Sequence, residues 1–185
     1  MQGFSFPPIT GIRGHINNGL TNTDVWSLAV VGNTVFAATE TGVFISTDNG
    51  NSWMQKNNGL TNTTVWSFAG GGNAVFTGTY GSIYLSTDNG DSWMLKDNGM
   101  TSGGIHSLAV AGNTVFAGTW GGGVFVSTNN GDSWIKKNNK MMNTTYVWSL
   151  AVAGSIVFAG TSAVGVFIST DNGNSWILKK NGMTS

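Results

Sequence analysis

The sequence predicts an all-β fold, a β-propeller whose four blades each contain four antiparallel strands. Three observations predict it. A string of the form S-T-[DN]-N-G-[ND]-S-W occurs four times, beginning at Ser46, Ser86, Ser127 and Ser169, at intervals of about 40 residues. Segments similar to VWSLAV, TVFAGT and GVFIST recur in phase with it. No segment of useful length has the periodicity of an amphipathic helix.

Each repeat contains four short runs of β-branched, aromatic and other apolar residues, separated by Gly and Asn. In the first repeat we expect strands at residues 25–30, 35–39, 43–46 and 53–56. Gly32-Asn33 predicts a tight type II′ turn between the first two strands, since Gly tolerates positive φ at the first central position. The predicted blades span residues 17–60, 61–100, 101–141 and 142–185, after an N-terminal extension of residues 1–16.

The predicted strands are apolar on both faces, as the first one, VWSLAV, illustrates. One blade cannot cover both of its own faces, whereas a stack of blades can, and this explains why such repeats occur in arrays. A parallel solenoid is the alternative architecture, although solenoid repeats are usually shorter.

The four strings share the motif S-x-D-x-G-x-x-W, and on this motif the chain resembles the Asp-box, or BNR, repeat family over all four repeats. That family includes sialidases, sortilin-type receptors, some plant-polysaccharide hydrolases and a photosystem assembly factor. The resemblance implies a β-propeller whose Asp boxes lie on the rim, away from the ligand-binding face. Because the motif marks a hairpin and not a chemistry, it predicts no activity by itself.

We assign the residues of the boxes a structural role. Each Gly is expected at positive φ, each acidic residue is expected to accept hydrogen bonds from backbone N–H groups of the turn, and each Trp is expected to plug the blade. Asn129 replaces Asp in the third box. The spacing does not follow an EF-hand calcium loop. The box residues are Ser46, Asp48, Gly50, Trp53, Ser86, Asp88, Gly90, Trp93, Ser127, Asn129, Gly131, Trp134, Ser169, Asp171, Gly173 and Trp176.

The opposite end of the blades carries the residues that differ between repeats. The loops between the second and third strands place Glu40, Tyr80, Trp120 and Ser162 at one repeated position, and the first strands open with Trp26, Trp66, His106 and Trp148. Aromatic rings on a neutral face rich in Asn, Gly and Thr suit stacking on sugars. The alternative is that the strand aromatics only pack between blades.

Composition excludes several function classes. Net charge is zero with His neutral, and no basic patch with interleaved aromatics occurs, so neither nucleic acid nor an anionic membrane is an expected partner. Cysteine is absent, and His and acidic residues form no ligand cluster, so we expect no metal and no cofactor.

Catalytic residues are also missing from the pattern. The sialidases of the Asp-box family use an arginine triad, whereas this chain has a single arginine, Arg13. The carboxylates on the loop end, Asp24, Glu40 and Asp97, each lie at a different position of their repeat, so they form no predicted glycosidase pair. We predict a non-catalytic binding or scaffolding module with a carbohydrate or protein ligand, and a glycoside hydrolase of the Asp-box class is the alternative.

Residues 11–20, GIRGHINNGL, resemble the end of the first repeat, SWMQKNNGL, and suggest a vestigial strand of a preceding blade. Left open, the first and last blades would each expose an apolar face. We expect self-association into a homodimer that closes an eight-bladed ring; the alternatives are a closed four-bladed monomer and a piece of a longer chain. The first sixteen residues show no signal peptide, and we expect an extracytoplasmic or secreted protein from a bacterium.

Overall fold

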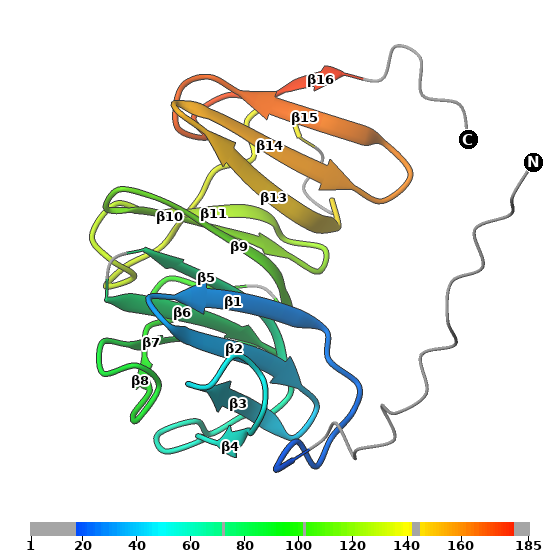
Figure 1. Ribbon diagram of the computed structural model, residues 1–185. Helices are drawn as coiled ribbons and strands as arrows, with labels where there is room; N and C mark the ends of the chain where they lie inside the picture. The colour runs from blue at the N-terminus through cyan, green and yellow to red at the C-terminus, as the bar shows by residue number, and fades with distance from the viewer. Residues whose placement is uncertain (1–17, 72, 102, 142–144, 180–185) are drawn as a thin grey trace, which may run out of the picture.

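Sixteen β-strands and no helix make up the part of the chain that the computed structural model describes, residues 18–71, 73–101, 103–141 and 145–179. The strands form four separate sheets of four, and within each sheet the strands pair antiparallel in sequence order. Figure 1 shows the blades following one another in chain order, from the blue first blade to the orange fourth blade. The predicted all-β propeller architecture is confirmed.

The strand bounds repeat from blade to blade. The first blade consists of β1 (Ser27–Val31), β2 (Thr34–Thr39), β3 (Gly42–Ser46) and β4 (Met54–Gln55). The second consists of β5 (Val65–Gly71), β6 (Ala74–Thr79), β7 (Ile83–Ser86) and β8 (Met94–Leu95). The third consists of β9 (Ile105–Ala111), β10 (Thr114–Thr119), β11 (Gly123–Ser127) and β12 (Ile135–Lys136). The fourth consists of β13 (Val147–Ala153), β14 (Ile156–Thr161), β15 (Gly165–Ser169) and β16 (Ile177–Lys179).

The turn between β1 and β2 has the predicted geometry. Gly32 has a φ of 57°, whereas Asn33 is not among the residues with positive φ, as a type II′ turn requires. Gly112 and Gly154 have φ values of 57° and 60° at the same place in the third and fourth blades. The fourth strand of the first blade is shorter than predicted, because β4 begins after Trp53 and ends before Lys56.

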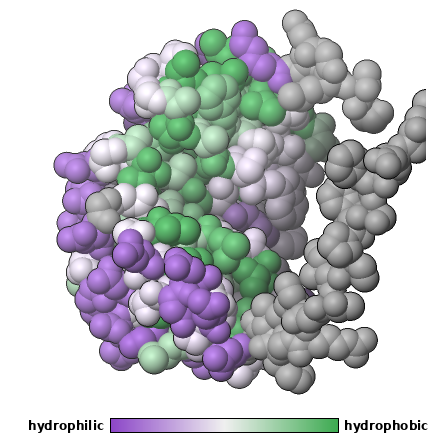
Figure 2. All heavy atoms as spheres, in the orientation of Figure 1, coloured by the Kyte–Doolittle hydropathy of each residue, from purple (hydrophilic) through white to green (hydrophobic). Residues whose placement is uncertain are grey.

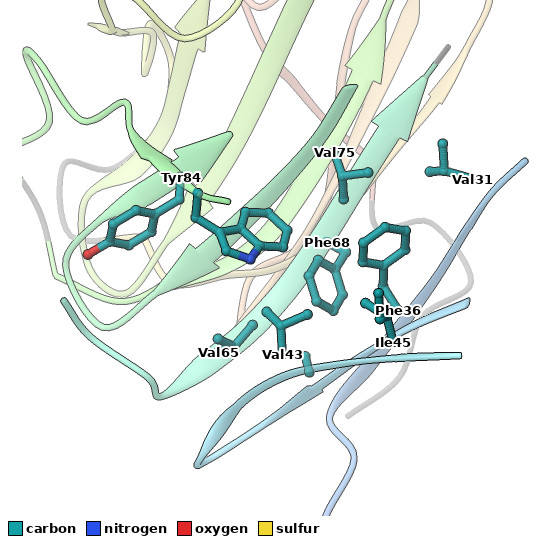
Figure 3. Packing of buried hydrophobic residues seen from close by; sticks show 10 residues of the cluster. Val31, Phe36, Val43, Ile45, Val65, Phe68, Val75 and Tyr84 are labelled. Atoms are coloured by element: carbon teal, nitrogen blue, oxygen red, sulfur yellow. The ribbon is translucent and has the colours of Figure 1, made fainter. Parts of the chain in front are cut away.

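Three hydrophobic clusters hold the blades together, one at each boundary between neighbouring blades. Figure 3 shows the first cluster, in which Phe36, Val43 and Ile45 from the first blade face Phe68 and other residues of the second. The Phe36 and Phe68 ring centroids lie 5.9 Å apart. Both faces of the inner blades are therefore buried, as the strand pattern predicts.

The turn between the third and fourth strand of each blade, residues 46–53, 86–93, 127–134 and 169–176, is called here the STDNG turn. In the first of them, the Ser46 hydroxyl accepts a hydrogen bond from Gly50 N (2.8 Å) and donates one to Asp48 Oδ1 (2.8 Å). Asp48 Oδ1 also accepts from Ser52 N at 2.9 Å. The remaining turns repeat this network, the third with Asn129 at the Asp position.

Hydrogen bonds in the STDNG turns set the charge state of their carboxylates. Donation from the Ser52 hydroxyl, then from its backbone N–H and from Ser46, lowers the pKa of Asp48 to about 2. The equivalent serines lower the pKa of Asp88 and of Asp171 to about 2 as well. All four turn glycines have positive φ, between 83° and 88°, as predicted. The Asn before each Gly also has positive φ, which the sequence analysis did not predict.

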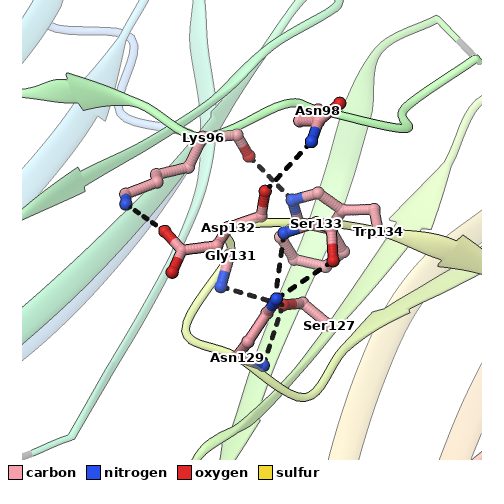
Figure 4. A network of polar contacts seen from close by, with 8 residues as sticks. All are labelled: Lys96, Asn98, Ser127, Asn129, Gly131, Asp132, Ser133 and Trp134. Carbon is pink, nitrogen blue, oxygen red and sulfur yellow. Dashed lines mark hydrogen bonds and ion pairs between the residues drawn. The ribbon is translucent and has the colours of Figure 1, made fainter.

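The STDNG turns also join neighbouring blades. Trp134 Nε1 donates to the carbonyl oxygen of Lys96 in the preceding blade at 2.7 Å, and the Lys96 ammonium group forms an ion pair with Asp132 (Figure 4). Trp93 and Trp176 donate to the carbonyl oxygens of Lys56 and Lys137 in the same way. Each of these turns therefore closes one blade and fastens it to the blade before it.

The first and fourth blades lie at opposite ends of the row (Figure 1). Leu28 in the first blade is 63 % exposed, whereas its counterparts Phe68 and Leu108 are 7 % and 6 % exposed. Figure 2 shows hydrophobic residues on the surface over β1 and over the fourth blade. The described blades thus form an open arc and not a closed four-bladed ring.

The predicted vestigial strand lies mostly outside the described residues, as does the whole predicted N-terminal extension. Only residues 18–20 of it are described. Asn18 O accepts a hydrogen bond from Trp53 N at 2.7 Å, as Asn58 O does from Trp93 N and Asn98 O from Trp134 N, both at 2.9 Å. Residues 18–20 therefore stand where the end of a preceding blade would stand.

Candidate binding site at the loop end of the blades

Six aromatic side chains gather at the end of the blades opposite the STDNG turns. Trp66, His106 and Trp148 stand at the start of β5, β9 and β13, where the chain enters each blade. Tyr80 and Trp120 lie in the loops after β6 and β10, and Tyr146 directly precedes β13. Antiparallel pairing brings the start of each first strand beside the end of the second, so these positions meet at one end. The six residues are called here the aromatic cluster.

The rings of the aromatic cluster contact one another across three blades. His106 stacks on Trp66 with ring centroids 4.3 Å apart and planes inclined by 19°. Trp148 meets His106 edge-on at 4.6 Å, and Trp120 lies 5.2 Å from His106 and 6.0 Å from Trp148. These separations are those of favourable aromatic pairs. The aromatic residues of the first strands therefore contact one another across the blade boundaries and form one continuous series.

Much of the aromatic cluster is open to solvent. Tyr80 is 62 % exposed, and Trp120 and Trp148 are each 48 % exposed. Large aromatic side chains are costly to expose and are enriched at recognition surfaces. The exposed faces of these rings are consequently available to stack against a ligand.

Two glycines make room for a pocket of about 200 Å³ within the cluster, lined by Tyr80, Gly103, Gly104 and Trp120. A Cβ atom at Gly104 would lie 1.7 Å from the Trp66 ring, so the indole packs directly on the Gly104 backbone. Gly104 O accepts a hydrogen bond from Trp120 N at 2.9 Å. The absence of a side chain at residue 104 therefore lets the Trp66 indole pack on this backbone and leaves room for the pocket between Tyr80 and Trp120.

His106 lies at the centre of the ring contacts. Its Nε2 atom is buried and has no hydrogen-bond partner among the described residues, which is rare for a buried polar atom. Burial lowers the pKa of His106 below its ordinary value. The imidazole is therefore neutral near pH 7, and it packs in the cluster as a flat ring.

Hydrogen bonds between asparagine side chains and the backbone hold the loops that carry the exposed rings. Asn62 Nδ2 donates to Tyr80 O at 2.9 Å. Asn138 holds the neighbouring loop through Val124 N, which donates to its Oδ1 at 2.8 Å, and through Gly122 O, which accepts from its Nδ2 at 2.7 Å. The exposed rings thus project from loops tied to the sheets, as a pre-formed binding surface requires.

The structure brings five of the seven candidate ligand-binding residues into ring contact, and the other two stand apart. Trp26 and Glu40 occupy the equivalent positions of the first blade, where both are exposed. Neither takes part in a ring contact among the described residues. Ser162, the fourth-blade counterpart of Tyr80, is also exposed.

Tyr146 and Gly104 also belong to this site, and neither was predicted from the sequence. They occupy the same position of their repeats, directly before the first strand, where the other two blades have Asp24 and Thr64. Alignment of the repeats at this position would have shown it to be as variable as the loops. Tyr146 packs against Trp120 with ring centroids 5.9 Å apart.

The three loop-end carboxylates are not equivalent. Asp97 accepts a hydrogen bond from Ser82 Oγ at 3.1 Å, at the position where Asn57 and Asn138 hold the loops of the first and third blades. Its place in the repeat is thus that of a loop anchor. Asp24 and Glu40 are exposed on the first blade.

In the described part of the chain, no three His, Cys, Asp or Glu side chains are grouped so that they could hold a metal ion. None of the described segments is a helix able to span a membrane.

The sequence matches no protein-family model and no curated protein. Solved structures, in contrast, are similar to it. An ancestral GH74 enzyme aligns over 86 % of this chain with 28 % identity and a TM-score of 0.72. The extracellular domain of BT4673 from B. thetaiotaomicron aligns over 88 % with 19 % identity and a TM-score of 0.71, and YCF48 bound to D1 peptide over 83 % with 15 % identity and a TM-score of 0.66.

The neighbours include an independent example of the fold in a WD40 β-propeller domain, with 16 % identity and a TM-score of 0.67. These likenesses agree with the propeller fold derived from the repeat. The chain spans 24 % of the length of the GH74 enzyme, 23 % of the BT4673 domain and 54 % of YCF48.

Proposed function

We propose that this chain is a non-catalytic β-propeller module of the Asp-box type that binds carbohydrate through its aromatic cluster. The observation that carries the proposal is the continuous series of ring contacts across three blades, in which Tyr80, Trp120 and Trp148 are exposed, with a pocket between Tyr80 and Trp120. Sugar rings present apolar C–H faces that pack on indole and phenol rings, while their hydroxyls require polar neighbours.

The surroundings of the cluster favour a neutral ligand. The chain carries no net charge, and charged residues are only 9 % of it. The residues near the rings are rich in Asn, Thr and Gly, whose amides, hydroxyls and backbone groups can hydrogen-bond sugar hydroxyls. The contacting rings extend over three blades, and their exposed members Tyr80, Trp120 and Trp148 come from all three, which suits a chain of several sugar units better than a single sugar.

Two of the similar structures support a carbohydrate ligand. One is a GH74 enzyme, and another is an extracellular domain, a location where polysaccharides are encountered. The likeness to an extracellular domain is also the reason why the proposal includes an extracytoplasmic location for this chain. The likeness to YCF48 bound to D1 peptide supports the wider class of propeller binding modules.

The alternative is a glycoside hydrolase, favoured by the likeness to the GH74 enzyme. Asp24 and Glu40 are the carboxylates that would have to serve it, because Asp97 occupies the loop-anchor position. Hydrolysis of a polysaccharide that disappears in Asp24→Asn and in Glu40→Gln would establish the alternative and overturn the non-catalytic proposal.

A glycan array followed by titration calorimetry tests the proposal. We expect a glycan hit whose affinity falls at least about tenfold in Trp120→Ala and in Tyr80→Ala. Ile135→Ala is the matched control, because Ile135 is an exposed apolar residue on the same blade as Trp120 but belongs to the fourth strand. Silence across a broad array, or equal loss in the control, would contradict the proposal.

A further inference from the structure

The three boundaries between blades are built from the same parts, and the two halves of a fourth boundary are exposed on the first and fourth blades of the described part of the chain. In each formed boundary, the STDNG turn of one blade packs against the Phe in the second strand of the blade before it. A Cβ atom on the turn glycine would lie 3.0 Å from Phe36, 3.1 Å from Phe76 and 3.6 Å from Phe116 at the three boundaries.

The fourth blade has an exposed copy of the face against which the next blade packs, called here the acceptor half of a boundary. Phe158, Val166 and Ile168 are partly exposed, whereas their counterparts in the other three blades are buried. Ala151 is exposed, whereas its third-blade counterpart Ala109 is buried by the fourth blade. Lys179 occupies the position whose carbonyl oxygen accepts an indole N–H at every formed boundary.

The first blade has an exposed copy of the opposite face, which packs on the blade before it and is called here the donor half. Leu28 and Val30 are exposed on the face that the following blades use to cover the blade before them. Trp53 Nε1 has no hydrogen-bond acceptor among the described residues, whereas Trp93, Trp134 and Trp176 each have one. Asn51 stands where Asp91 and Asp132 pair with lysines and where Asn174 accepts a hydrogen bond from Lys137.

We infer that the fourth blade of one chain receives the first blade of a second copy, and that the second copy also completes the aromatic cluster. The occupant is a second copy because the missing half of each end is present on the other end of the same sequence. In a head-to-tail pair both boundaries form at once, so that assembly stops at two chains and encloses eight blades.

The second boundary would extend the aromatic cluster. Trp26 occupies the position of Trp66, His106 and Trp148, and neighbouring members of that series lie 4.3 Å and 4.6 Å apart. Across the new boundary, Trp26 of the second copy would follow Trp148 in the same series. The inferred pair therefore carries the strand-start ring of all four blades of each chain in one uninterrupted series.

Light scattering behind a sizing column tests the inference on the full chain. We expect a mass of about twice 19.4 kDa for the wild type. Leu28→Asp and Ala151→Asp each place a charge in one half of the boundary, at side chains that are exposed in the single chain, so both should give folded monomers. Met94→Asp, an exposed apolar residue of the second blade, should remain a dimer.

Mixing the two monomeric variants separates a head-to-tail pair from other dimers. The Leu28→Asp chain retains an intact fourth blade and the Ala151→Asp chain an intact first blade, so the mixture can form one undamaged boundary and should recover dimer. A wild-type monomer, an assembly larger than two, a dimer that survives either variant, or a mixture that stays monomeric would each overturn the inference. Circular dichroism of each variant verifies that its blades are folded.

Discussion

The two ends of each blade differ in how closely the four repeats agree. At one end, the STDNG turns repeat the same hydrogen bonds four times, with similar φ values and nearly the same residues. At the other end, one loop position holds Glu40, Tyr80, Trp120 and Ser162. The end at which the four repeats agree builds the fold, since it also joins the blades, whereas the end at which they differ is free to carry recognition.

The largest effect should come from removing a Trp at the STDNG end. Trp134→Ala empties a buried indole site and leaves Lys96 O without its donor, so we expect a loss of about 3–5 kcal/mol in the free energy of unfolding. Trp120→Ala, at the exposed loop end, should cost less than about 1 kcal/mol. Urea denaturation measures both. Equal losses would show that the two ends do not differ as described.

A smaller effect separates the turn glycines. Gly131→Ala must place a Cβ at φ 86° and 3.1 Å from Phe76, whereas Gly112→Ala meets only the backbone strain at φ 57°, with no atom within 4 Å. We expect Gly131→Ala to destabilise by about 1–2 kcal/mol more than Gly112→Ala. If thermal unfolding gave the same loss for both, the contact between the turn and the preceding blade would contribute nothing.

Acid should weaken the two ends in different pH ranges. At the loop end, the folded protein lowers the pKa of His106, so the unfolded chain binds the proton more tightly. Stability is then full above about pH 6.5 and decreases as the pH falls below it. His106→Phe should flatten this part of a pH–stability curve measured by urea denaturation. An unchanged curve would contradict the buried, neutral imidazole.

At the STDNG end, the folded protein lowers the pKa of Asp48, Asp88 and Asp171 to about 2. The stability that these carboxylates contribute is present above about pH 3.9 and is lost as the pH falls toward 2. The triple variant with Asn at all three positions should lose this acid dependence. A wild-type curve that is flat between pH 4 and 2 would argue against the hydrogen-bonded carboxylates.

The smallest effect concerns the turn that departs from the pattern. In the third turn, Asn129 Oδ1 accepts from Ser127 Oγ and Ser133 N, while its Nδ2 donates to Ser133 Oγ at 3.0 Å. Asn129→Asp would let the Ser133 hydroxyl donate to a carboxylate, and we expect a gain of roughly 0.5 kcal/mol at pH 7. Destabilisation in a thermal melt would show that the third turn is adapted to the amide.

Most of the fold could be predicted from the sequence because the repeat gives each element four times. Gly32 and Gly50 indicate their turns because glycine readily adopts the positive φ that these turns require, and the strands lie between the turns. The prediction placed Trp53 with its fourth strand, but β4 begins at Met54. Residue type alone does not show that each turn Trp bonds the blade before it, because that contact depends on how the blades stack.

The candidate site was predictable only in part. Tyr80 and Trp120 stand out as aromatic residues at a variable loop position, and the structure places them around one pocket. The role of Gly104 was not visible, because a missing side chain matters only once Trp66 is known to pack on that backbone. Likewise, the stacking of His106 on Trp66 depends on the angle between two blades.

The most direct test of the difference between the two ends is a two-dimensional NMR titration of the indole N–H signals with the glycan that the array identifies. The chain has eight tryptophans, distributed between both ends, so one spectrum reports on both. Single Trp→Phe variants assign the signals. We predict that the signals of Trp66, Trp120 and Trp148 shift on binding while those of Trp93, Trp134 and Trp176 stay in place. Shifts confined to the STDNG-end tryptophans would contradict the assignment of recognition to the loop end.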